Sequence, residues 1–122
     1  MDGVLTIGGA EFAWGSRTYV MGIVNVTPDS FSGDGAVEPE RAAALGEAQV
    51  AAGADLVDVG GESTRPGSRP IGVEEELRRV VPAVRALARR VRVPISVDTY
   101  KAEVARQAIA AGASILNDVW GL

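Results

Sequence analysis

The chain has 122 residues, 47% of them hydrophobic, which is enough to bury the core of one domain. Its net charge of −4 predicts no nucleic-acid partner. Cysteine and histidine are both missing, which excludes disulfides, thiolate-held zinc and serine–histidine catalysis. The first residues lack the pattern of a signal peptide and no apolar run could span a bilayer, so we expect a cytoplasmic protein without membrane contacts.

The first predicted element is a β-hairpin. Val4–Ile7 and Ala10–Trp14 flank the turn dipeptide Gly8-Gly9, a common connection between two antiparallel strands. Such a hairpin could close the bottom of a barrel. An apolar strand is predicted next, at about Tyr19–Val26.

Three helices are predicted farther along the chain. They run from about Pro39 to Ala52, through a segment that begins with Glu74–Glu76 and ends with Arg89 and Arg90, and from about Lys101 to Ala111. The middle helix is the clearest, because acidic residues at its start and basic residues at its end match the helix dipole. Its apolar residues fall at helical spacing on one stripe: Leu77, Val80, Val81, Val84, Leu87 and Val91. Pro82 lies inside this pattern and should kink the helix or delay its start.

A repeated unit indicates the fold class. The segments Ala51–Val59 and Ala110–Val119 are near copies, each with a helix end, a glycine and an apolar strand. Four strands are predicted in all, at about Tyr19–Val26, Asp55–Gly60, Pro94–Thr99 and Ser114–Val119. Repeated βα units indicate an α/β fold with a parallel sheet, either a (β/α)8 barrel or a doubly wound sheet. No Gly-x-Gly-x-x-Gly turn follows the first of these strands, which disfavours the doubly wound sheet.

Polar residues stand near the carboxyl ends of all four strands. They are Asn25, Asp58, Asp98, and Asn117 with Asp118. Functional groups of α/β folds gather at this end of the sheet, so we expect these side chains to line one site. One such residue alone could simply open a turn, but four in four strands favour a site.

Two loops add chemistry to this end of the sheet. Between Asp58 and Gly67, two glycines are followed by a carboxylate, two hydroxyls and a guanidinium, a combination suited to a phosphorylated molecule. Between Asn25 and Gly35, the polar side chains are oxygen donors, which suit a hard cation such as Mg²⁺.

The motifs in these segments closely resemble those of the dihydropteroate synthase family. The resemblance lies in Met21–Ser32, Asp58–Gly67, Ser96–Thr99 and Ile115–Asp118, and it covers the chain from about Gly3 onward. It implies that residues 1–122 are the N-terminal half of a single pterin-binding TIM (β/α)8 barrel domain, with the hairpin and about strands 1–4. The implied activity is a transferase reaction of folate biosynthesis. It condenses 4-aminobenzoate with (7,8-dihydropterin-6-yl)methyl diphosphate to give dihydropteroate and pyrophosphate.

The resemblance also assigns roles to residues. Asn25 would ligate the Mg²⁺ that holds the diphosphate, and Thr64 and Arg65 would contact the diphosphate itself. Asp98 and Asn117 would hydrogen-bond the pterin ring. The remaining substrate-binding positions would be Phe31 and Pro66, beside the aminobenzoate, and Asp58, which supports the loop from beneath.

Arg65 and Asp34 are the catalytic candidates. Asp34 stands two residues after Ser32, whereas many family members have an aspartate directly after that serine, so its role would be filled from a shifted position. Later strands of the family supply another aspartate, a lysine and an arginine–histidine pair, and none of these maps onto this sequence. We therefore expect the isolated chain to be inactive, with unpaired sheet edges that favour self-association, and a homodimer in the complete enzyme.

Two other functions remain open. A pterin-binding methyltransferase domain would share the barrel and the aspartate and asparagine at the strand ends. A non-catalytic fragment that keeps only the pterin subsite is the other alternative.

The remaining charged and aromatic residues are interpreted as structural. Lys101 at a helix start is predicted to be a solvated first-turn residue. Arg78, Arg79, Arg85, Arg89 and Arg90 are predicted to form the wet face of one helix. Trp14 and Tyr19 are predicted to pack under the barrel.

Overall fold

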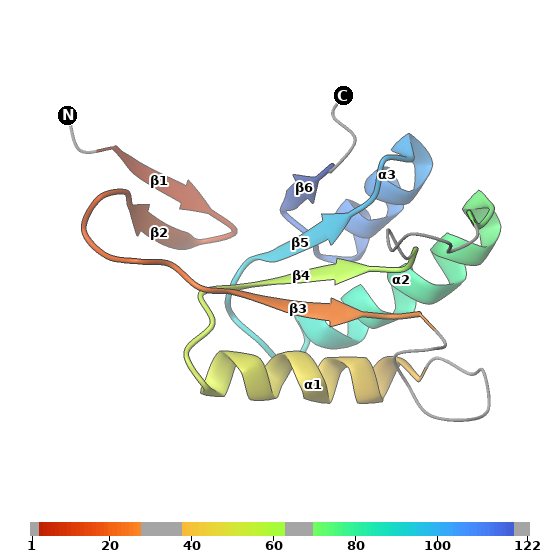
Figure 1. Cartoon of the computed structure of the whole chain (residues 1–122), viewed down its shortest axis with the longest axis horizontal. Coiled ribbons are helices and arrows are strands. Elements are labelled where there is room, and N and C mark those ends of the chain that lie inside the picture. The colour runs from red at the N-terminus through yellow and green to blue at the C-terminus, as the bar shows by residue number, and fades with distance from the viewer. Residues whose placement is uncertain (1–2, 28–37, 63–69, 119–122) are drawn as a thin grey trace.

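The structure, a computed structural model, describes residues 3–27, 38–62 and 70–118. Two sheets and three helices make up this part of the chain (Figure 1). The hairpin consists of β1 (Val4–Ile7) and β2 (Ala10–Ala13). The second sheet contains β3 (Met21–Asn25), β4 (Leu56–Gly60), β5 (Ile95–Asp98) and β6 (Ile115–Asn117). The helices are α1 (Pro39–Ala51), α2 (Val73–Ala88) and α3 (Ala102–Ala111).

The four-stranded sheet is parallel throughout, in the order β3-β4-β5-β6. Each strand pairs with the next one along the chain, and a helix connects each pair, which confirms the predicted repetition of βα units. The strands are shorter than predicted, although backbone hydrogen bonds such as Val26 N–H to Gly60 O and Ser114 N–H to Ile95 O continue just beyond their ends. In Figure 1 the four arrows point the same way, so the carboxyl ends of the strands share one edge of the molecule.

One face of this sheet packs against the three helices. Its residues alternate along each strand, so Val57 and Val59 face the helices while Asp58 between them faces the other way. Val57 and Val59 are fully buried, as is Val84 of α2. The core of the described residues therefore lies between the sheet and the helix layer.

The other face of the sheet is open at β3. Met21 is 42% exposed and Ile23 is 52% exposed, although both belong to a strand whose helix-facing Val24 is 1% exposed. Large apolar side chains at such exposure need a covering that the described residues do not provide.

The hairpin lies at the amino ends of the strands. A Cβ added at Gly8 would meet Ser114 Oγ at 2.8 Å and Pro94 Cα at 3.6 Å, and these two residues precede β6 and β5. The hairpin and the following segment carry an aromatic cluster of Phe12, Trp14 and Tyr19, with ring centroids 4.9 to 5.5 Å apart. Trp14 and Tyr19 thus pack against each other and Phe12, but Trp14 stays 47% exposed, and their packing under a barrel stays a prediction.

The prediction that Pro82 delays the start of helix α2 is wrong, whereas the kink predicted as the alternative stays a prediction. The helix continues from Val73 to Ala88 without a break. A proline in a helix interior costs about 3 kcal/mol, but Val80 and Val84 on either side are both fully buried against the core. Packing on both sides of the proline therefore holds the helix together. Among the described residues, none of the helices has the length and apolarity needed to cross a membrane.

Candidate functional site

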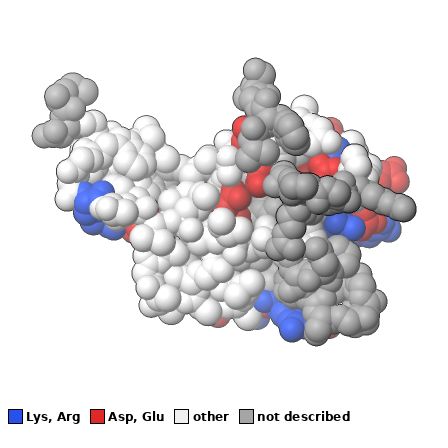
Figure 2. Space-filling view, viewed as in Figure 1, with Lys and Arg blue, Asp and Glu red and all other residues white. Residues whose placement is uncertain are grey.

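The polar residues at the strand ends occupy two neighbouring rows of the sheet. The row at the carboxyl edge consists of Asn25, Gly60, Asp98 and Asn117, and the row beneath it consists of Ile23, Asp58, Ser96 and Ile115. All of them lie on the face opposite the helices. The strand register places four predicted residues on one face near the same edge of the sheet: Asn25, Asp98 and Asn117 in one row and Asp58 in the row beneath it. Acidic side chains are visible at this end of the strands in Figure 2.

Asp58 is the buried member of the group. It is 4% exposed, and Asn117 Nδ2 donates to its Oδ1 over 3.4 Å. Burial raises the pKa of Asp58, and the polar side chains of Ser96 and Asn117 counteract this rise only in part. Asp58 thereby helps to orient the amide of Asn117. The loop that Asp58 is predicted to support lies largely outside the described residues, so that role stays a prediction.

Asp98 lies at the exposed edge of the same group. A Cβ added at Gly60 would lie 3.4 Å from Asp98 Cβ, so these two positions are direct neighbours across the row. Burial, followed by the charges of Asp58, Glu76 and Asp118, raises the pKa of Asp98 to about 6. Asp98 is therefore a carboxylate that changes its charge close to neutral pH.

This rim offers a donor and acceptor set rather than a nucleophile. The carboxylates of Asp58 and Asp98 accept hydrogen bonds when ionised, and the amide of Asn117 both donates and accepts. A flat heterocycle with N–H and carbonyl groups along one edge matches such a set. Perturbed acid pKa values together with convergent polar groups are typical of a functional site.

Asn25 has the chemistry of a metal ligand but stands apart from the acids. Its side chain is exposed at the end of β3, and its amide oxygen is a hard donor that suits Mg²⁺. Within residues 3–27, 38–62 and 70–118 there is no cluster of three or more acidic, histidine or cysteine side chains that could hold a metal. The amide of Asn25 is thus compatible in chemistry with the predicted role of a Mg²⁺ ligand, which stays a prediction.

Five predicted site residues lie outside the described residues. They are Phe31, Asp34, Thr64, Arg65 and Pro66. Their assignments stay predictions.

The sequence reasoning missed a buried charge cluster beside the rim. Lys101 Nζ lies 2.6 Å from Glu76 Oε1 and 3.1 Å from Glu62 Oε1. Its side chain is 13% exposed, so the interpretation of Lys101 as a solvated residue is wrong. Although burial alone would lower it, the pKa of Lys101 is raised by its hydrogen bonds to Glu76 and Glu62. We call Glu62, Glu76 and Lys101 the Lys101 cluster.

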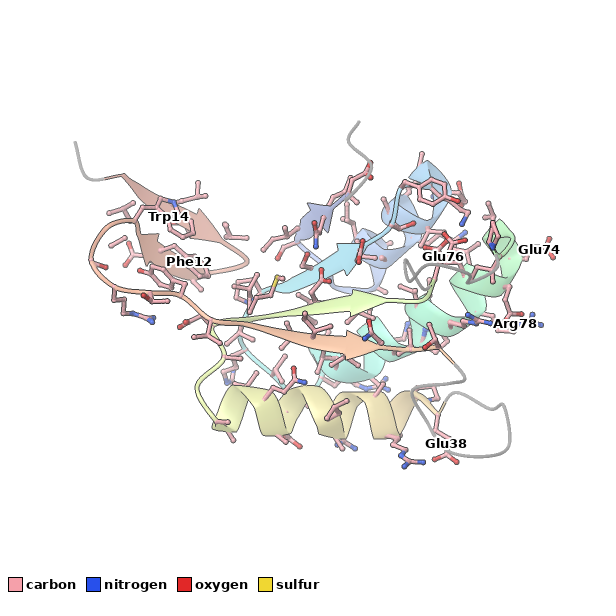
Figure 3. The ribbon with its side chains drawn as sticks, in the orientation of Figure 1. Phe12, Trp14, Glu38, Glu74, Glu76 and Arg78 are labelled. Carbon is pink, nitrogen blue, oxygen red and sulfur yellow. The ribbon has the colours of Figure 1, made fainter. Side chains whose placement is uncertain are left out.

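The prediction that Arg79 belongs to the wet face of α2 is also wrong. The side chain of Arg79 is 15% exposed and its Nη1 donates to Gly61 O over 2.8 Å. Arg78, by contrast, is 73% exposed, as predicted. Figure 3 shows Glu74 and Arg78 pointing away from the molecule while Glu76 points toward the sheet edge.

A signal for this cluster was present in the sequence. Glu76 lies four residues before Val80 and therefore on the same buried stripe of α2. A carboxylate on a buried stripe requires a cation, and Lys101 is the single lysine of the sequence. The helix dipole also accounts for acidic residues at Glu74–Glu76, so this pattern alone does not indicate that Glu76 is buried and needs a cation.

Comparison with known proteins places this geometry in a family. A family model described as a pterin binding enzyme matches residues 21–122. The chain is 51% identical over 118 residues to a dihydropteroate synthase of Clostridium beijerinckii, covering 96% of this chain and 44% of the relative. It is 53% identical over 109 residues to the dihydropteroate synthase of Escherichia coli K12, covering 88% and 38%.

Solved structures of dihydropteroate synthases also match this chain. Xanthomonas albilineans dihydropteroate synthase with 4-aminobenzoic acid matches with a TM-score of 0.83 and 54% identity, over 92% of this chain and 42% of that one. Clostridium difficile dihydropteroate synthase in the presence of pteroic acid matches with a TM-score of 0.86 and 51% identity, over 91% and 43%.

The chain spans less than half the length of these relatives. The hairpin and the parallel order β3-β4-β5-β6 correspond to part of a TIM (β/α)8 barrel, which confirms the predicted fold class. With the family model matching residues 21–122 and the carboxyl ends of four barrel strands carrying the polar rim, the chain belongs to the family of pterin-binding enzymes.

Proposed function

We propose that this chain supplies the pterin-binding part of a dihydropteroate synthase. The observation that carries the proposal is the row of Asn25, Gly60, Asp98 and Asn117 at the carboxyl edge of the sheet, with Asp58 beneath it. The relatives matched at about 50% identity are named dihydropteroate synthases, and two of the matching structures hold 4-aminobenzoic acid or 7,8-dihydropteroate. The proposed reaction joins 4-aminobenzoate to (7,8-dihydropterin-6-yl)methyl diphosphate and releases pyrophosphate.

Asp98 and Asn117 are assigned to the pterin ring. Ionised Asp98 accepts hydrogen bonds from ring N–H groups, and Asn117 supplies a donor and an acceptor beside it. Asp58 fixes the amide of Asn117 through the 3.4 Å contact and thereby determines which group Asn117 presents. The heterocycle is bound at the rim by groups whose geometry the sheet determines.

The diphosphate is assigned to the loops that follow β3 and β4. Asn25 is the proposed Mg²⁺ ligand, and Thr64 and Arg65 are the proposed diphosphate contacts. A bound Mg²⁺ would neutralise charge on the diphosphate. Phe31 and Pro66 are assigned to the aminobenzoate, and Asp34 remains a catalytic candidate in the first loop.

The proposed reaction does not require a strong protein base. The bond between the pterin methylene carbon and the diphosphate oxygen breaks, and the bond between that carbon and the amine nitrogen forms, with loss of a proton from the nitrogen. The guanidinium of Arg65 would stabilise the charge that develops on the departing diphosphate. The rim residues hold the pterin so that its methylene carbon faces the amine.

We propose that the isolated 122-residue chain has little or no turnover. Within the described residues, β3 and β6 are edge strands with one neighbour each, and Met21 and Ile23 are exposed on the open face. Unpaired edges and exposed apolar side chains favour self-association or pairing with further barrel strands. The homodimer and cytoplasmic location of the complete enzyme are proposals of the same kind.

Calorimetry tests the proposal. The chain should bind a pterin, and Asp98→Asn should weaken binding by roughly tenfold or more through loss of a charge-assisted acceptor. Glu103→Gln, which changes an exposed acid paired with Arg106, should bind as the unchanged chain does. Binding that survives Asp98→Asn would refute the assigned site. When the chain is supplied with the remaining strands of a relative, consumption of 4-aminobenzoate supports the synthase, and transfer of a methyl group to a corrinoid instead would support the methyltransferase alternative.

A further inference from the structure

A short connection joins the pterin rim to helix α3. Asp98 ends β5 and Ala102 begins α3, so the connection consists of Thr99, Tyr100 and Lys101, which we call the Thr99 turn. Thr99 is 4% exposed and the Lys101 side chain is 13% exposed, so both are held inside the molecule. Three residues give the backbone a short reach between a strand end and a helix start. The place of Asp98 therefore depends on what holds this turn.

Thr99 bonds on both sides of the turn. Its backbone N–H donates to Asn117 O over 3.1 Å, so hydrogen bonding between β5 and β6 continues one residue beyond Asp98. Its Oγ1 accepts a hydrogen bond from the backbone N–H of Lys101 over 3.1 Å, which closes a side-chain turn. Thr99 therefore connects the backbone of the rim residue Asn117 to the residue at which α3 starts.

Lys101 anchors the far end of the turn. Its ammonium contacts Glu76 of α2 at 2.6 Å and Glu62, after β4, at 3.1 Å. The same ammonium lies 4.5 Å from the ring centroid of Tyr100. The backbone oxygen of Lys101 accepts the N–H of Ala105 over 3.0 Å and so begins the hydrogen bonding of α3. The residue that ends the Thr99 turn is thus held by two elements besides its own helix.

The Lys101 cluster contributes little if its role is stability alone. Glu76 is 1% exposed, and its Oε2 has no hydrogen-bond partner in the part of the chain that the structure describes. Buried ion pairs contribute little net stability compared with apolar residues of similar volume, because desolvation offsets the attraction. What such a pair does supply is a fixed geometry, and here that geometry lies three residues from Asp98.

We propose that Thr99 and Lys101 are positioning residues for pterin recognition: the anchored ammonium and the hydroxyl of Thr99 hold Asp98 in place against Asn117. The proposal rests on the proposed function for the identity of the ligand. Asp98 and Asn117 are paired directly across β5 and β6, and one flat ring must bond to both. Such a pair acts together only when its groups are held to within about 0.5 Å. A turn that is released would weaken the ring contacts without removing either side chain.

Two substitutions of Thr99 test the hydroxyl. Thr99→Val keeps a similar volume but removes the acceptor for the Lys101 N–H, and pterin affinity measured by calorimetry should fall roughly tenfold. Thr99→Ser keeps the hydroxyl and should bind within about threefold of the unchanged chain. No loss in Thr99→Val would overturn the proposal. An equal loss in both variants would also overturn it, because the lost methyl group and not the hydroxyl would then be responsible.

A double variant tests the anchor. Lys101→Met alone would leave Glu76 buried without a cation, so Lys101→Met is combined with Glu76→Gln, which replaces the ion pair with a neutral pair. Pterin affinity should fall roughly tenfold at pH 8, where Asp98 with its pKa of about 6 is ionised. Arg106→Met, which removes a 69% exposed cation from the same helix, is the matched control and should bind as the unchanged chain does. Full affinity in the double variant would contradict the proposal.

Combination with Asp98→Asn separates positioning from a general structural effect. If Thr99 acts through Asp98, adding Thr99→Val to Asp98→Asn should lower pterin affinity by less than about threefold further. A further loss as large as that of Thr99→Val in the unchanged chain would show that Thr99 acts independently of Asp98, and the proposal would be overturned.

Hydrogen exchange of the ligand-free chain tests the turn without any ligand. The Thr99 amide should exchange roughly tenfold faster in Thr99→Val and in the double variant, because the turn is no longer held. The Ser114 amide, which donates to Ile95 O at the other end of the same strand pair, should change by less than about threefold. Unchanged exchange at Thr99, or equal changes at both amides, would overturn the proposal. If the unchanged chain binds no pterin, the proposed function fails, and this comparison alone decides whether Lys101 and Thr99 hold the turn.

Discussion

The pH dependence of pterin binding is the sharpest consequence of the rim. Asp98 is crowded by the charges of Asp58, Glu76 and Asp118, and with its own burial these raise its pKa to about 6. Among the described residues, Lys101, Glu62 and Arg79 are further charged groups near this edge. If ionised Asp98 accepts hydrogen bonds from the pterin, protonation of Asp98 must weaken binding.

The size of the effect follows from that value. With a pKa of about 6, Asp98 is ionised in about nine-tenths of molecules at pH 7 and in about one-tenth at pH 5, so affinity should fall roughly tenfold between them. An aspartate with the ordinary pKa of about 3.9 would stay almost fully ionised over this range, and affinity would change by less than about a tenth. The two cases differ by far more than the error of a titration.

Calorimetric titration with a pterin at half-unit steps from pH 5 to pH 8 measures this dependence. The midpoint should lie near 6, and Asp98→Asn should remove the dependence along with most of the affinity. Glu76→Gln should move the midpoint downward, because one of the charges that raise the pKa of Asp98 is gone. A flat profile above pH 5 in the unchanged chain would refute the reasoning that Asp98 is both perturbed and in contact with the ring.

Other consequences concern stability and the metal. Because the folded-state pKa of Asp98 is raised, its contribution to stability is present below about pH 4 and lost as the pH rises through about 6, so Asp98→Asn should increase the melting temperature at pH 7. Gly61→Ala should lower the free energy of unfolding by about 1–3 kcal/mol because its Cβ would lie 2.7 Å from a methyl carbon of α2, whereas Gly3→Ala, whose nearest neighbouring atom would lie 3.9 Å from the added Cβ, should be neutral; equal effects in urea melts would contradict this. Leu87→Ala, at a 1% exposed site, should cost about 2–5 kcal/mol in the same melts, and a smaller loss would mean that the core closes around the gap. Asn25→Leu should abolish any gain in diphosphate affinity on adding Mg²⁺ without changing pterin affinity, and a gain that persists would place the metal elsewhere.

The fold could be predicted from the sequence because its signals are local and repeated. Near-continuous apolar strands, glycine stops and amphipathic helices recur with a fixed order, and parallel pairing follows from that order. The prediction that Pro82 delays the start of α2 was wrong because Val80 and Val84, on either side of the proline, are completely buried. This packing outweighs the local preference of proline against a helix interior.

The candidate site was predictable only where it depends on strand position. Asp98 and Asn117 could be placed at one rim because parallel strands end together. The spacing between rows could not be foreseen, since the register that places Asp58 opposite Ser96 rather than Asp98 is a property of pairing between segments. The raised pKa of Asp98 results from burial, then from the charges of Asp58 and Glu76, and strand patterns carry no information about Glu76, which belongs to a helix.

Lys101 shows why charge patterns on single elements mislead. When each element is considered alone, solvent adequately explains a lysine at the start of α3, and the helix dipole adequately explains the acidic first turn of α2. The need for a cation becomes clear only when the buried face of α2 is considered, because Glu76 lies on that face. Its carboxylate requires a positively charged partner there, which is Lys101. This cation, Lys101, follows β5 and also binds Glu62, which follows β4. The pairing of buried Glu76 therefore involves the edge of the sheet where the candidate site lies. A buried acid on an apolar stripe is therefore a constraint on the site itself, since satisfying it fixes the relative positions of two strand ends.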